Sequence, residues 1–561
     1  MTSRTNRALP IGTGLIAVLV MAVFAPVAGF DFINLDDDEY VYANAWIGQG
    51  VTFETLKQVF TGAYACNWHP LTWLSHMLDV RLFGLWAGGH HLTNVAIHAA
   101  ACLALVAVLV HLTGAVGPSL LVAALFAIHP LHVESVAWVS ERKDLLCALF
   151  YILGLGAWGF WVRQGGKAWY LVTAALLVAA LMSKPMAVTF PLVLLIVDFW
   201  PLGRWTRQSF GSLVAEKLPL CGLSLIAAVI TFGVQRNCGA VVSLDLGLAV
   251  RIANAVIAYA GYLVKTAVPA GLAVYYPYPK VIAVWQVAGA STALVLITWL
   301  GLRLKNRHPY VLAGWLWYLI ALVPVIGLVQ VGMQAAADRY TYLPLVGVFI
   351  ALAWAAQAAV QWRPAAKPII GAGLALMVAV LALGARWQLS HWTDSVTLFT
   401  RALAVTRDND MAHYNLAVAL ADRGDIGGAV RHYTMAAAIN SRHLQARNNL
   451  AAVLIDTGRI DQALAIGRQA LAIDPNHADT HCHLGMALYL AGRPEEAVAH
   501  LQKALSLDPG HVEAANNLGV IRAGQGDIAG AIRLFETVLG LVPGHPQAAA
   551  NLKALRQLPP E

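Results

Sequence analysis

Four consecutive carboxylates, Asp36 to Glu39, lie in the stretch FINLDDDEYVYANAW. They follow an uncharged run at 11–29 that is long enough to cross a bilayer. Most acidic runs are solvated loops. Here the same loop continues with NWHPLTWLSHMLDVRLFGLWAGGHHLTN, and its aromatic and apolar residues predict that it folds back on a membrane domain. Carboxylates beneath a loop that folds back in this way are positioned for catalysis or for binding a metal ion.

Histidines gather in this loop and in the next one along the chain. With Asp36 they could hold a divalent ion, because carboxylates favour Mg or Mn and imidazole favours Zn. No tight ligand spacing such as HExxH occurs, so structural or hydrogen-bonding roles are favoured. The sequence therefore predicts no certain cofactor and leaves a divalent metal ion open. The histidines are His69, His76, His90, His91, His129 and His132.

The elements that must position these groups are membrane helices. Of 561 residues, 59% are hydrophobic and only 12% are charged, whereas about a quarter are charged in a soluble globular chain. The composition predicts a polytopic membrane protein with about eleven spans. The uncharged or nearly uncharged runs lie at 11–29, 92–110, 118–133, 145–162, 168–183, 185–197, 218–235, 281–302, 309–328, 340–362 and 368–385.

Lys and Arg near the span ends predict the orientation, because these residues are retained on the cytoplasmic side. Residues 1–10 then form a cytoplasmic tail and 11–386 the membrane domain. The alternation of inner and outer loops is consistent along the chain if the apolar piece at 252–264 does not fully cross the membrane and dips in from the outside. The predicted outer loops are 30–91, 129–144, 236–280 and 329–340, and everything after about residue 387 lies outside.

The N-terminal run, the net charge and the cysteines each allow a further interpretation. Residues 1–29 could be a cleaved signal peptide, which would still leave the acids outside. The net charge of +7 is spread along the loops without a basic run interleaved with aromatics, so nucleic acid is not an expected partner. The six cysteines show no metal-ligand spacing, and a disulfide between Cys66 and Cys238 is left open.

The last third of the chain has an internal period. Asn-Leu or His-Leu pairs recur every 34 residues, as do a glycine and a small residue, which is the spacing of tetratricopeptide repeats. This pattern predicts a repeat domain at 387–561. Its parts are a half-repeat at 391–406, repeats at 412–445, 446–479, 480–513 and 514–547, and a capping helix at 548–557.

One position of these repeats carries asparagine three times, at Asn415, Asn449 and Asn517. A repeat superhelix presents a concave surface that suits an extended partner. An amide side chain both donates to and accepts from a peptide backbone, so these residues could bind a polypeptide acceptor. Alternatively, asparagine is simply common at this position and points at water.

Several motifs together resemble a known family. FINLDDDEYVYAN is followed by WHPLTWLSHMLD, HHLTNVAIHA, HPLHVESVAWVSERKDLL and AADRYTYLPL, with tetratricopeptide repeats behind. In this order they resemble the transmembrane and tetratricopeptide-repeat (TMTC-type) O-mannosyltransferases, which are GT-C membrane glycosyltransferases. The resemblance implies an all-α fold, a GT-C-type transmembrane domain followed by an α-solenoid. It also implies a polyprenyl-phosphate-linked, mannose-like sugar as donor and a protein hydroxyl as acceptor.

The resemblance carries over residue by residue. The first-loop pattern fits Asp36, Asp37 and Asn44, and the residues that match the second-loop and late-loop patterns are His129, His132, Glu134, Arg142 and Asp144, then Asp338, Arg339, Tyr342, Leu343 and Pro344. The third-loop region, 237–280, departs from the family pattern, since its AVYYPYP resembles it only loosely.

The chemistry of such a donor assigns roles to these residues. Asp36 or Asp37 can act as general base for the acceptor hydroxyl, with inversion at the sugar through an oxocarbenium-like state. Outer-face cations suit the leaving phosphate, and Arg142, Lys184 and Arg339 are the ones we expect to bind it, from a set that also holds Lys143, Arg251 and Lys265. Simple snorkelling is the alternative for Lys184. We expect Asp338 to orient Arg339, Arg142 to face the same cavity, and His69 to support the site.

Two further functions stay open at this level. The chain could be a non-enzymatic membrane scaffold whose repeats assemble an envelope complex, or a GT-C enzyme whose acceptor is a lipid or a glycan. Acids and cations spread over three outer loops favour an enzyme. The short loops favour a bacterial inner membrane, with the repeats in the periplasm or outside.

Overall fold

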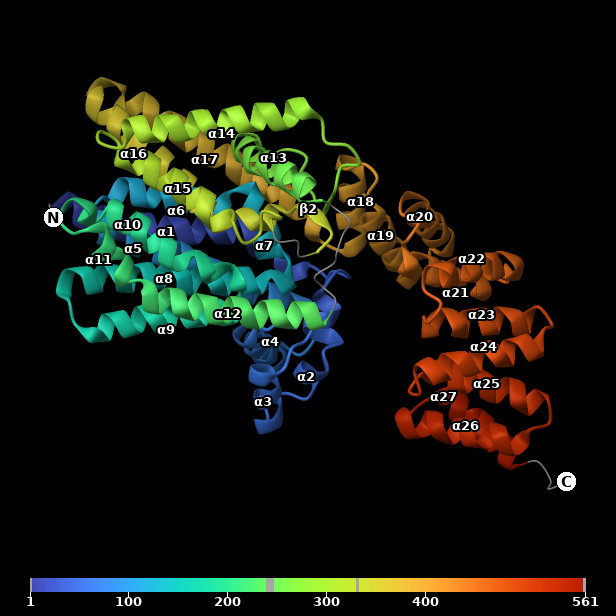
Figure 1. Ribbon diagram of the computed structural model, residues 1–561. Coiled ribbons are helices and arrows are strands. Elements are labelled where there is room, and N and C mark those ends of the chain that lie inside the picture. Colours follow the sequence, from blue (N-terminus) through green and yellow to red (C-terminus); the bar gives the residue numbers. More distant parts are fainter. Residues whose placement is uncertain (1–2, 239–246, 329–331, 558–561) are drawn as a thin grey trace. The chain divides into compact units, whose positions relative to one another are not determined.

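The computed structural model describes residues 3–238, 247–328 and 332–557 and is almost entirely helical (Figure 1). The chain divides into two compact units, Met1–Arg407 and Asp408–Glu561. Helices of an apolar bundle make up the first unit and a regular solenoid makes up the second. The predicted all-α fold, a polytopic helical domain followed by tetratricopeptide repeats, is confirmed.

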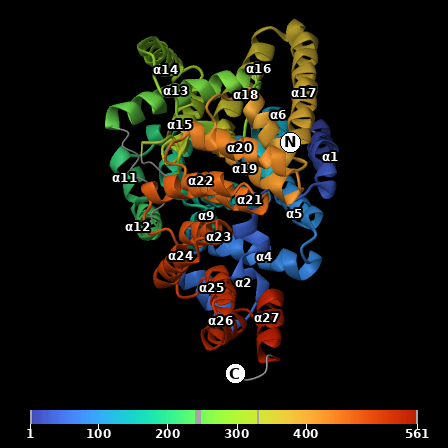
Figure 2. The same cartoon turned by 90° about the vertical axis from the view of Figure 1, so that its right-hand side faces the viewer.

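The first unit is a bundle of long helices with short helices at one end (Figures 1 and 2). A two-stranded antiparallel pair, β1 (Tyr276–Pro277) and β2 (Gln334–Ala336), joins two of its loops. The helices are α1 (Ser3–Phe24), α2 (Ala45–Gly48), α3 (Phe53–Thr61), α4 (Pro70–Phe83), α5 (Ala87–Thr113), α6 (Val116–Ile128), α7 (Val133–Ala137), α8 (Arg142–Gln164), α9 (Lys167–Ser183), α10 (Phe190–Phe199), α11 (Phe210–Ala215), α12 (Leu218–Asn237), α13 (Leu248–Ala267), α14 (Val284–Leu304), α15 (Pro309–Leu322), α16 (Leu345–Trp362), α17 (Lys367–Leu389) and α18 (Ser395–Val405).

The bundle defines a multi-pass membrane protein. Within the described ranges, eight helices are long and apolar enough to cross a bilayer, and a ninth span forms if α6 and the bent segment after it count as one. Each of the eleven apolar runs of the sequence overlaps one of these helices, the bent pair, or a shorter apolar helix (α9, α15, or the one at Pro185–Phe199). How many of them cross stays a prediction.

Close helix contact in this bundle depends on glycine. A Cβ at Gly314 of α15 would lie 2.2 Å from the carbonyl oxygen of Gly347 on α16, and a Cβ at Gly347 would lie 2.3 Å from that of Gly314. Small residues let the backbones of membrane helices approach, because packing replaces the hydrophobic effect there as the attractive force. The helix α16 begins shortly after Arg339. The contact between α15 and α16 therefore helps to hold the segment around Arg339 in place.

The helix α13 is long and apolar enough to span, although we expected 252–264 to fall short of a full crossing. Both of its ends contact one stretch of chain: Arg251 Nη1 donates to the Leu328 carbonyl (3.1 Å) and Lys265 Nζ lies 2.9 Å from Asp338 Oδ1. The ends of a spanning helix lie about 30 Å apart, on opposite sides of the hydrocarbon. That α13 does not fully cross stays a prediction, because the ten-residue segment from Leu328 to Asp338 is long enough to follow it over such a distance.

Topology reporters test this arrangement. Fusions after residue 165 or 305 are expected to read cytoplasmic, and fusions after 337 or 410 to read outside, because Lys and Arg in short loops stay inside. A full crossing by α13 would reverse the readings after 305 and 410. A cytoplasmic repeat domain would contradict the placement of the repeats on the same side as the acids.

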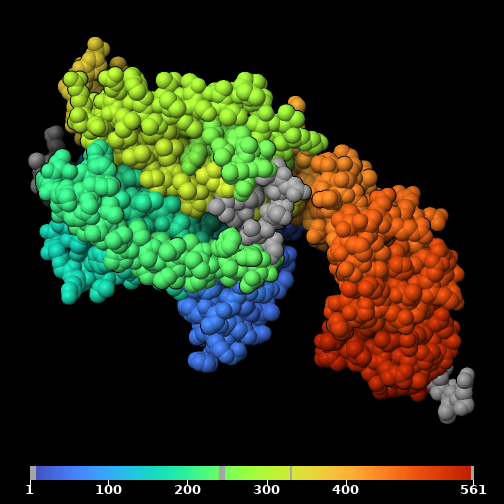
Figure 3. All heavy atoms as spheres, viewed as in Figure 1, coloured from blue at the N-terminus to red at the C-terminus, as the bar shows by residue number. Residues whose placement is uncertain are grey.

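The first long loop folds onto the bundle, as predicted. Its helices α2, α3 and α4 bury an apolar cluster that includes Tyr40, Ile47, Trp73 and Met77 and also takes in Val139 from the start of the α8 region. In Figure 3 this blue segment forms a compact projection beside the green α12. The acids therefore stand on a packed substructure and not on a solvated loop.

The second unit repeats one helical pair. Corresponding helices begin 34 residues apart, so the predicted tetratricopeptide solenoid is confirmed. Gly424, Gly458, Gly492 and Gly526 end the first helix of each pair at φ between +69° and +85°, a conformation that favours glycine. The helices are α19 (Asp410–Asp422), α20 (Ile426–Ile439), α21 (Leu444–Asp456), α22 (Ile460–Ile473), α23 (Ala478–Leu490), α24 (Pro494–Leu507), α25 (Val512–Gly524), α26 (Ile528–Leu541) and α27 (Pro546–Arg556).

Candidate active site

Asp37 ties the first outer loop to the segment before α8. Its side chain is fully buried and accepts hydrogen bonds from the backbone N–H groups of Ile33 (2.9 Å) and Ser140 (2.9 Å), and from the Ser140 hydroxyl. Burial raises the pKa of Asp37 to about 6, against the lowering effect of these hydrogen bonds. With its oxygens engaged by the protein, Asp37 positions the loop.

Asp36, the preceding residue, points elsewhere. Two fifths of its side chain (40%) stay accessible, and Oδ2 lies 4.0 Å from Lys143 Nζ. Removal from water raises the pKa of Asp36 above its usual range, while Lys143 partly opposes the rise. The next residues form one turn of π-helix, Asp38–Tyr42, which is a local widening that often occurs at functional sites. Of the two paired acids, Asp36 is the one with an open face.

Glu141 gathers three cations. Its carboxylate is buried, with Lys143 Nζ at 3.2 Å, Lys184 Nζ at 3.0 Å and Arg339 Nε at 3.3 Å. We call Lys143, Lys184 and Arg339 the cation cluster. They come from three separate segments: the first turn of α8, the residue before the 3-10 helix η5 (Pro185–Thr189), and the 3-10 helix η7 (Asp338–Thr341). One carboxylate thus draws together positive charges that are distant in the sequence.

Arg339 is the most firmly held member of the cluster. Its Nη1 lies 2.5 Å from Glu134 Oε1, and its guanidinium carbon is 5.2 Å from the ring centre of Trp138. Burial disfavours its charge, but the carboxylates of Glu134 and Glu141 outweigh burial and raise the pKa of Arg339 well above its usual range. The Nη2 atom of Arg339 takes part in neither of the contacts with Glu134 and Glu141. The fork is therefore oriented and permanently charged.

Asp338 does not orient Arg339, so that expectation is wrong. Its Oδ1 pairs with Lys265 Nζ at 2.9 Å, and its Oδ2 accepts from the Tyr276 hydroxyl at 2.8 Å. Asp338 thereby joins the end of α13 and β1 to the loop that carries Arg339. Glu134, which also accepts from the Arg339 backbone N–H at 3.3 Å, takes the orienting role.

Arg142 does not face the cation cluster, so that expectation is wrong too. It is completely buried, 2.5 Å from Asp79, and donates to Asn94 Oδ1 and to the carbonyl of His90, each at 2.8 Å. Consecutive residues of a helix point about 100° apart, so Arg142 and Lys143 cannot both face one cavity. Arg142 locks α4 to α5, while Lys143 reaches the acids.

The remaining predicted supports hold the local structure. Asn44 caps α2 by accepting from the backbone N–H groups of Trp46 and Ile47, and Asp144 pairs with Lys184 at 2.6 Å. Tyr342 donates toward, or accepts from, His98 at 2.6 Å inside the bundle. Lys184 is ion-paired on two sides and does not simply snorkel to the bilayer edge.

Three of the histidines make hydrogen bonds within the protein. His69 Nδ1 lies 3.4 Å from the Tyr40 hydroxyl, His129 Nε2 lies 3.1 Å from the Thr266 carbonyl, and His132 Nδ1 lies 2.8 Å from the Phe126 carbonyl. Across the described residues, no group of three or more His, Cys, Asp or Glu is arranged to hold a metal ion.

The asparagines of the repeats bond to neighbouring protein atoms. Asn449 donates to the Tyr414 hydroxyl at 3.3 Å, and Asn517 to the Cys482 sulfur at 3.8 Å, each one repeat earlier. Asn415 is buried and donates to the Met411 carbonyl at 3.0 Å. The bonds of Asn449 and Asn517 join repeats, while that of Asn415 stays within α19, and an acceptor-binding role for the three asparagines stays a proposal.

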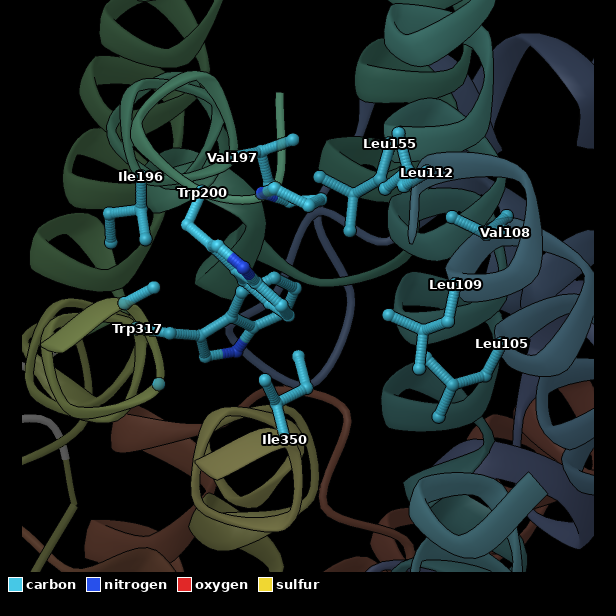
Figure 4. Close-up of a pocket in the computed structure, with 13 residues that line it drawn as sticks. Leu105, Val108, Leu109, Leu112, Leu155, Ile196, Val197, Trp200, Trp317 and Ile350 are labelled. Carbon is cyan, nitrogen blue, oxygen red and sulfur yellow. The ribbon is translucent and has the colours of Figure 1, made fainter. Parts of the chain in front are cut away.

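A small apolar cavity of about 20 Å³ lies deeper in the bundle (Figure 4). In the close-up, Trp200 and Trp317 stand opposite Leu105 and Leu109 of α5. No ionisable side chain lines it, so it suits hydrocarbon and not sugar or phosphate. The lining is Leu105, Val108, Leu109, Leu112, Leu155, Ile196, Val197, Trp200, Pro201, Ala313, Gly314, Trp317 and Ile350.

The sequence did not identify Glu141 as the centre of the site. It gave Lys143 only as one of several cations on the predicted outer face. A signal was present in SERKD, where four charged residues open a span on the outer side. Ser140, the first residue of that stretch, anchors Asp37. The whole stretch, and not its arginine alone, builds the site.

The family comparisons agree with this architecture. The tetratricopeptide repeat family matches at 385–443, 442–510 and 488–555. Among solved structures, the chain is similar to YrrB, described as a TPR protein with an unusual peptide-binding site (24% identity, 28% of this chain, 81% of that chain, TM-score 0.25). It is also similar to MamA of Desulfovibrio magneticus RS-1 (23%, 27% and 85%, TM-score 0.25).

Curated proteins match longer stretches of the chain. The chain is 25% identical over 433 residues to Protein O-mannosyl-transferase TMTC4 of Homo sapiens, covering 65% of this chain and 57% of that protein. It is 31% identical over 194 residues to Tmtc2 of Drosophila melanogaster, covering 32% of this chain and 21% of that protein. The chain thus spans less than two thirds of the length of these relatives.

Fold and site together define a multi-pass helical membrane protein with an acid and cation cluster at one end of its bundle and a tetratricopeptide solenoid behind it. The chain is similar to the TMTC-type proteins, as its motifs predicted.

Proposed function

We propose that this protein is a GT-C-type membrane glycosyltransferase. It transfers a mannose-like sugar from a polyprenyl-phosphate donor to a hydroxyl group of a polypeptide, on the extracytoplasmic side. The names of its curated relatives, protein O-mannosyl-transferases, support the reaction class. One structural observation carries the proposal: the open carboxylate of Asp36 lies 4.0 Å from the cation cluster that Glu141 assembles.

The geometry divides the reaction between the two groups. Asp36 accepts the proton of the attacking hydroxyl as general base. The hydroxyl oxygen forms a bond to the anomeric carbon with inversion while the bond from that carbon to the phosphate oxygen breaks. Polyprenyl phosphate leaves with the bonding electrons, and Arg339 and Lys143 stabilise its charge. Glu134 and Glu141 keep the Arg339 fork in position between turnovers.

The other parts of the chain fit the same scheme. The repeats offer a surface for the acceptor polypeptide. A bacterial inner membrane with the repeats in the periplasm is the location we propose. No step of the scheme requires a metal ion.

A vesicle assay tests the proposal. The full chain, purified and placed in vesicles with radiolabelled polyprenyl-phosphate mannose, is expected to label a peptide rich in serine and threonine. Comparing the glycoproteome of a strain that lacks the protein with its parent is expected to show lost hexose on extracytoplasmic proteins. Label on a lipid or glycan would overturn the polypeptide acceptor, and no transfer at all would favour a repeat scaffold.

A further inference from the structure

Cys66 lies at the tip of a strained turn in the first outer loop. Tyr64 and Asn67 exchange backbone hydrogen bonds of 3.1 and 2.9 Å, which leaves Ala65 and Cys66 as the two turn residues. Both have left-handed backbone angles, φ +47° and +56°, where glycine or asparagine would be relaxed. Such a conformation persists only when its surroundings enforce it.

The surroundings of this turn do enforce it. Tyr64 packs against Trp46 and Trp73, with ring centres 5.2 and 5.9 Å apart, and Trp68 Nε1 donates to the Phe60 carbonyl at 2.9 Å. These contacts hold the turn that carries the Cys66 thiol. The Cys66 thiol has a defined contact partner.

That partner is Cys238, 172 residues further along the chain at the end of α12. The Cys66 sulfur lies 3.8 Å from the Cys238 carbonyl oxygen, and the two thiols contact each other. Burial and this contact raise the pKa of Cys66 to about 11, so the neutral thiol is stable where it stands until it is oxidised. All six cysteines are free thiols in the structure; Cys238 is exposed, Cys221 lies in α12 itself, and Cys102, Cys147 and Cys482 lie on other helices.

We propose that Cys66 and Cys238 form a disulfide that fastens the first outer loop to the end of α12. The two thiols lose two protons and two electrons as the S–S bond forms, and a disulfide of an extracytoplasmic thiol oxidoreductase accepts the electrons and becomes a dithiol. The inference rests on the placement of both loops outside, where disulfides persist. It does not rest on the transfer reaction.

The link connects the two halves of the site. The loop that contains Cys66 also carries Asp36, while α12 packs against α9 and η5, the segments on either side of Lys184. A cross-link that closes a long loop stabilises mainly by restricting the unfolded chain. The disulfide would therefore hold the acid and one of the cluster's lysines at a set separation.

Differential thiol labelling tests the link. Membranes are treated with N-ethylmaleimide under denaturing conditions, then reduced, and new thiols are labelled with polyethylene glycol maleimide. Wild-type chain is expected to gain two labels, while C66S and C238S gain none. C221S, which removes the half-buried cysteine of α12, is the matched control and keeps both labels. Mass spectrometry should find the two peptides joined and lighter by two hydrogens.

Two outcomes would overturn the proposal. One is a wild-type chain in which Cys66 and Cys238 are both blocked before reduction. The other is a reducible band of twice the mass, because that indicates a bond between chains. Thermal unfolding adds an independent readout: reductant is expected to lower the Tm of the wild type by several degrees to that of C66S/C238S, and to leave the double variant unchanged.

Discussion

Replacing Asp36 by Asn is expected to lower the rate of sugar transfer by about 10²-fold or more, because general base catalysis contributes on that order. The substitution keeps size and hydrogen-bonding capacity. Asp36 is partly open and does not hold the loop together, so the Tm is expected to stay near that of the wild type. Initial rates in the vesicle assay, at saturating donor, measure the loss.

Its neighbours provide matched controls. Glu39→Gln removes a nearby exposed carboxylate and is expected to leave transfer within about twofold of the wild type, since an exposed side chain away from the cluster contributes little. Asp37→Asn places an amide where three donors point, so it is expected to lower the Tm as well as the rate. Full activity in D36N would rule out Asp36 as the base.

Arg339→Lys is expected to lower kcat/KM for the donor by about tenfold or more, and Arg339→Ala by about 10²-fold. A hydrogen bond to a charged group contributes about 1.5–3 kcal/mol, and each 1.4 kcal/mol is a factor of ten. Lysine keeps the charge but lacks the planar fork, so it cannot reach Glu134, Glu141 and a phosphate together. Donor titration in the vesicle assay separates binding from the chemical step.

The matched control is Arg363→Lys, an exposed arginine at the opposite end of α16, which is expected to behave as the wild type. Because R339A leaves the buried Glu134 without its cation and Glu141 with two of its three, its Tm must be measured beside its rate. The charge-conserving R339K variant keeps the test decisive if R339A unfolds. Normal transfer by both variants would favour the scaffold.

Comparison of the expected and observed sites shows where sequence reasoning succeeded. Asp36, Lys184, Glu134 and Arg339 come from loops far apart in the chain, and the structure brings them around Glu141. The motifs could propose these residues because each one opens or closes an apolar run. The motifs could not show which of these residues is exposed and which is ion-paired, because exposure and ion pairing depend on contacts between the loops.

Local patterns by themselves determined the repeat period and the positions of the apolar runs. A 34-residue spacing and an uncharged stretch are properties of neighbouring residues, and each dictates a helix without reference to the rest of the chain. Only the tertiary structure decided which acid is open and which cation joins the cluster. Asp36 and Asp37 are chemically identical in the sequence, and Arg142 and Lys143 are adjacent side chains of the same charge. The two side chains of each pair point in different directions. In the interior Asp37 contacts Ser140 and Arg142 contacts Asp79, while Asp36 faces the cation cluster to which Lys143 belongs.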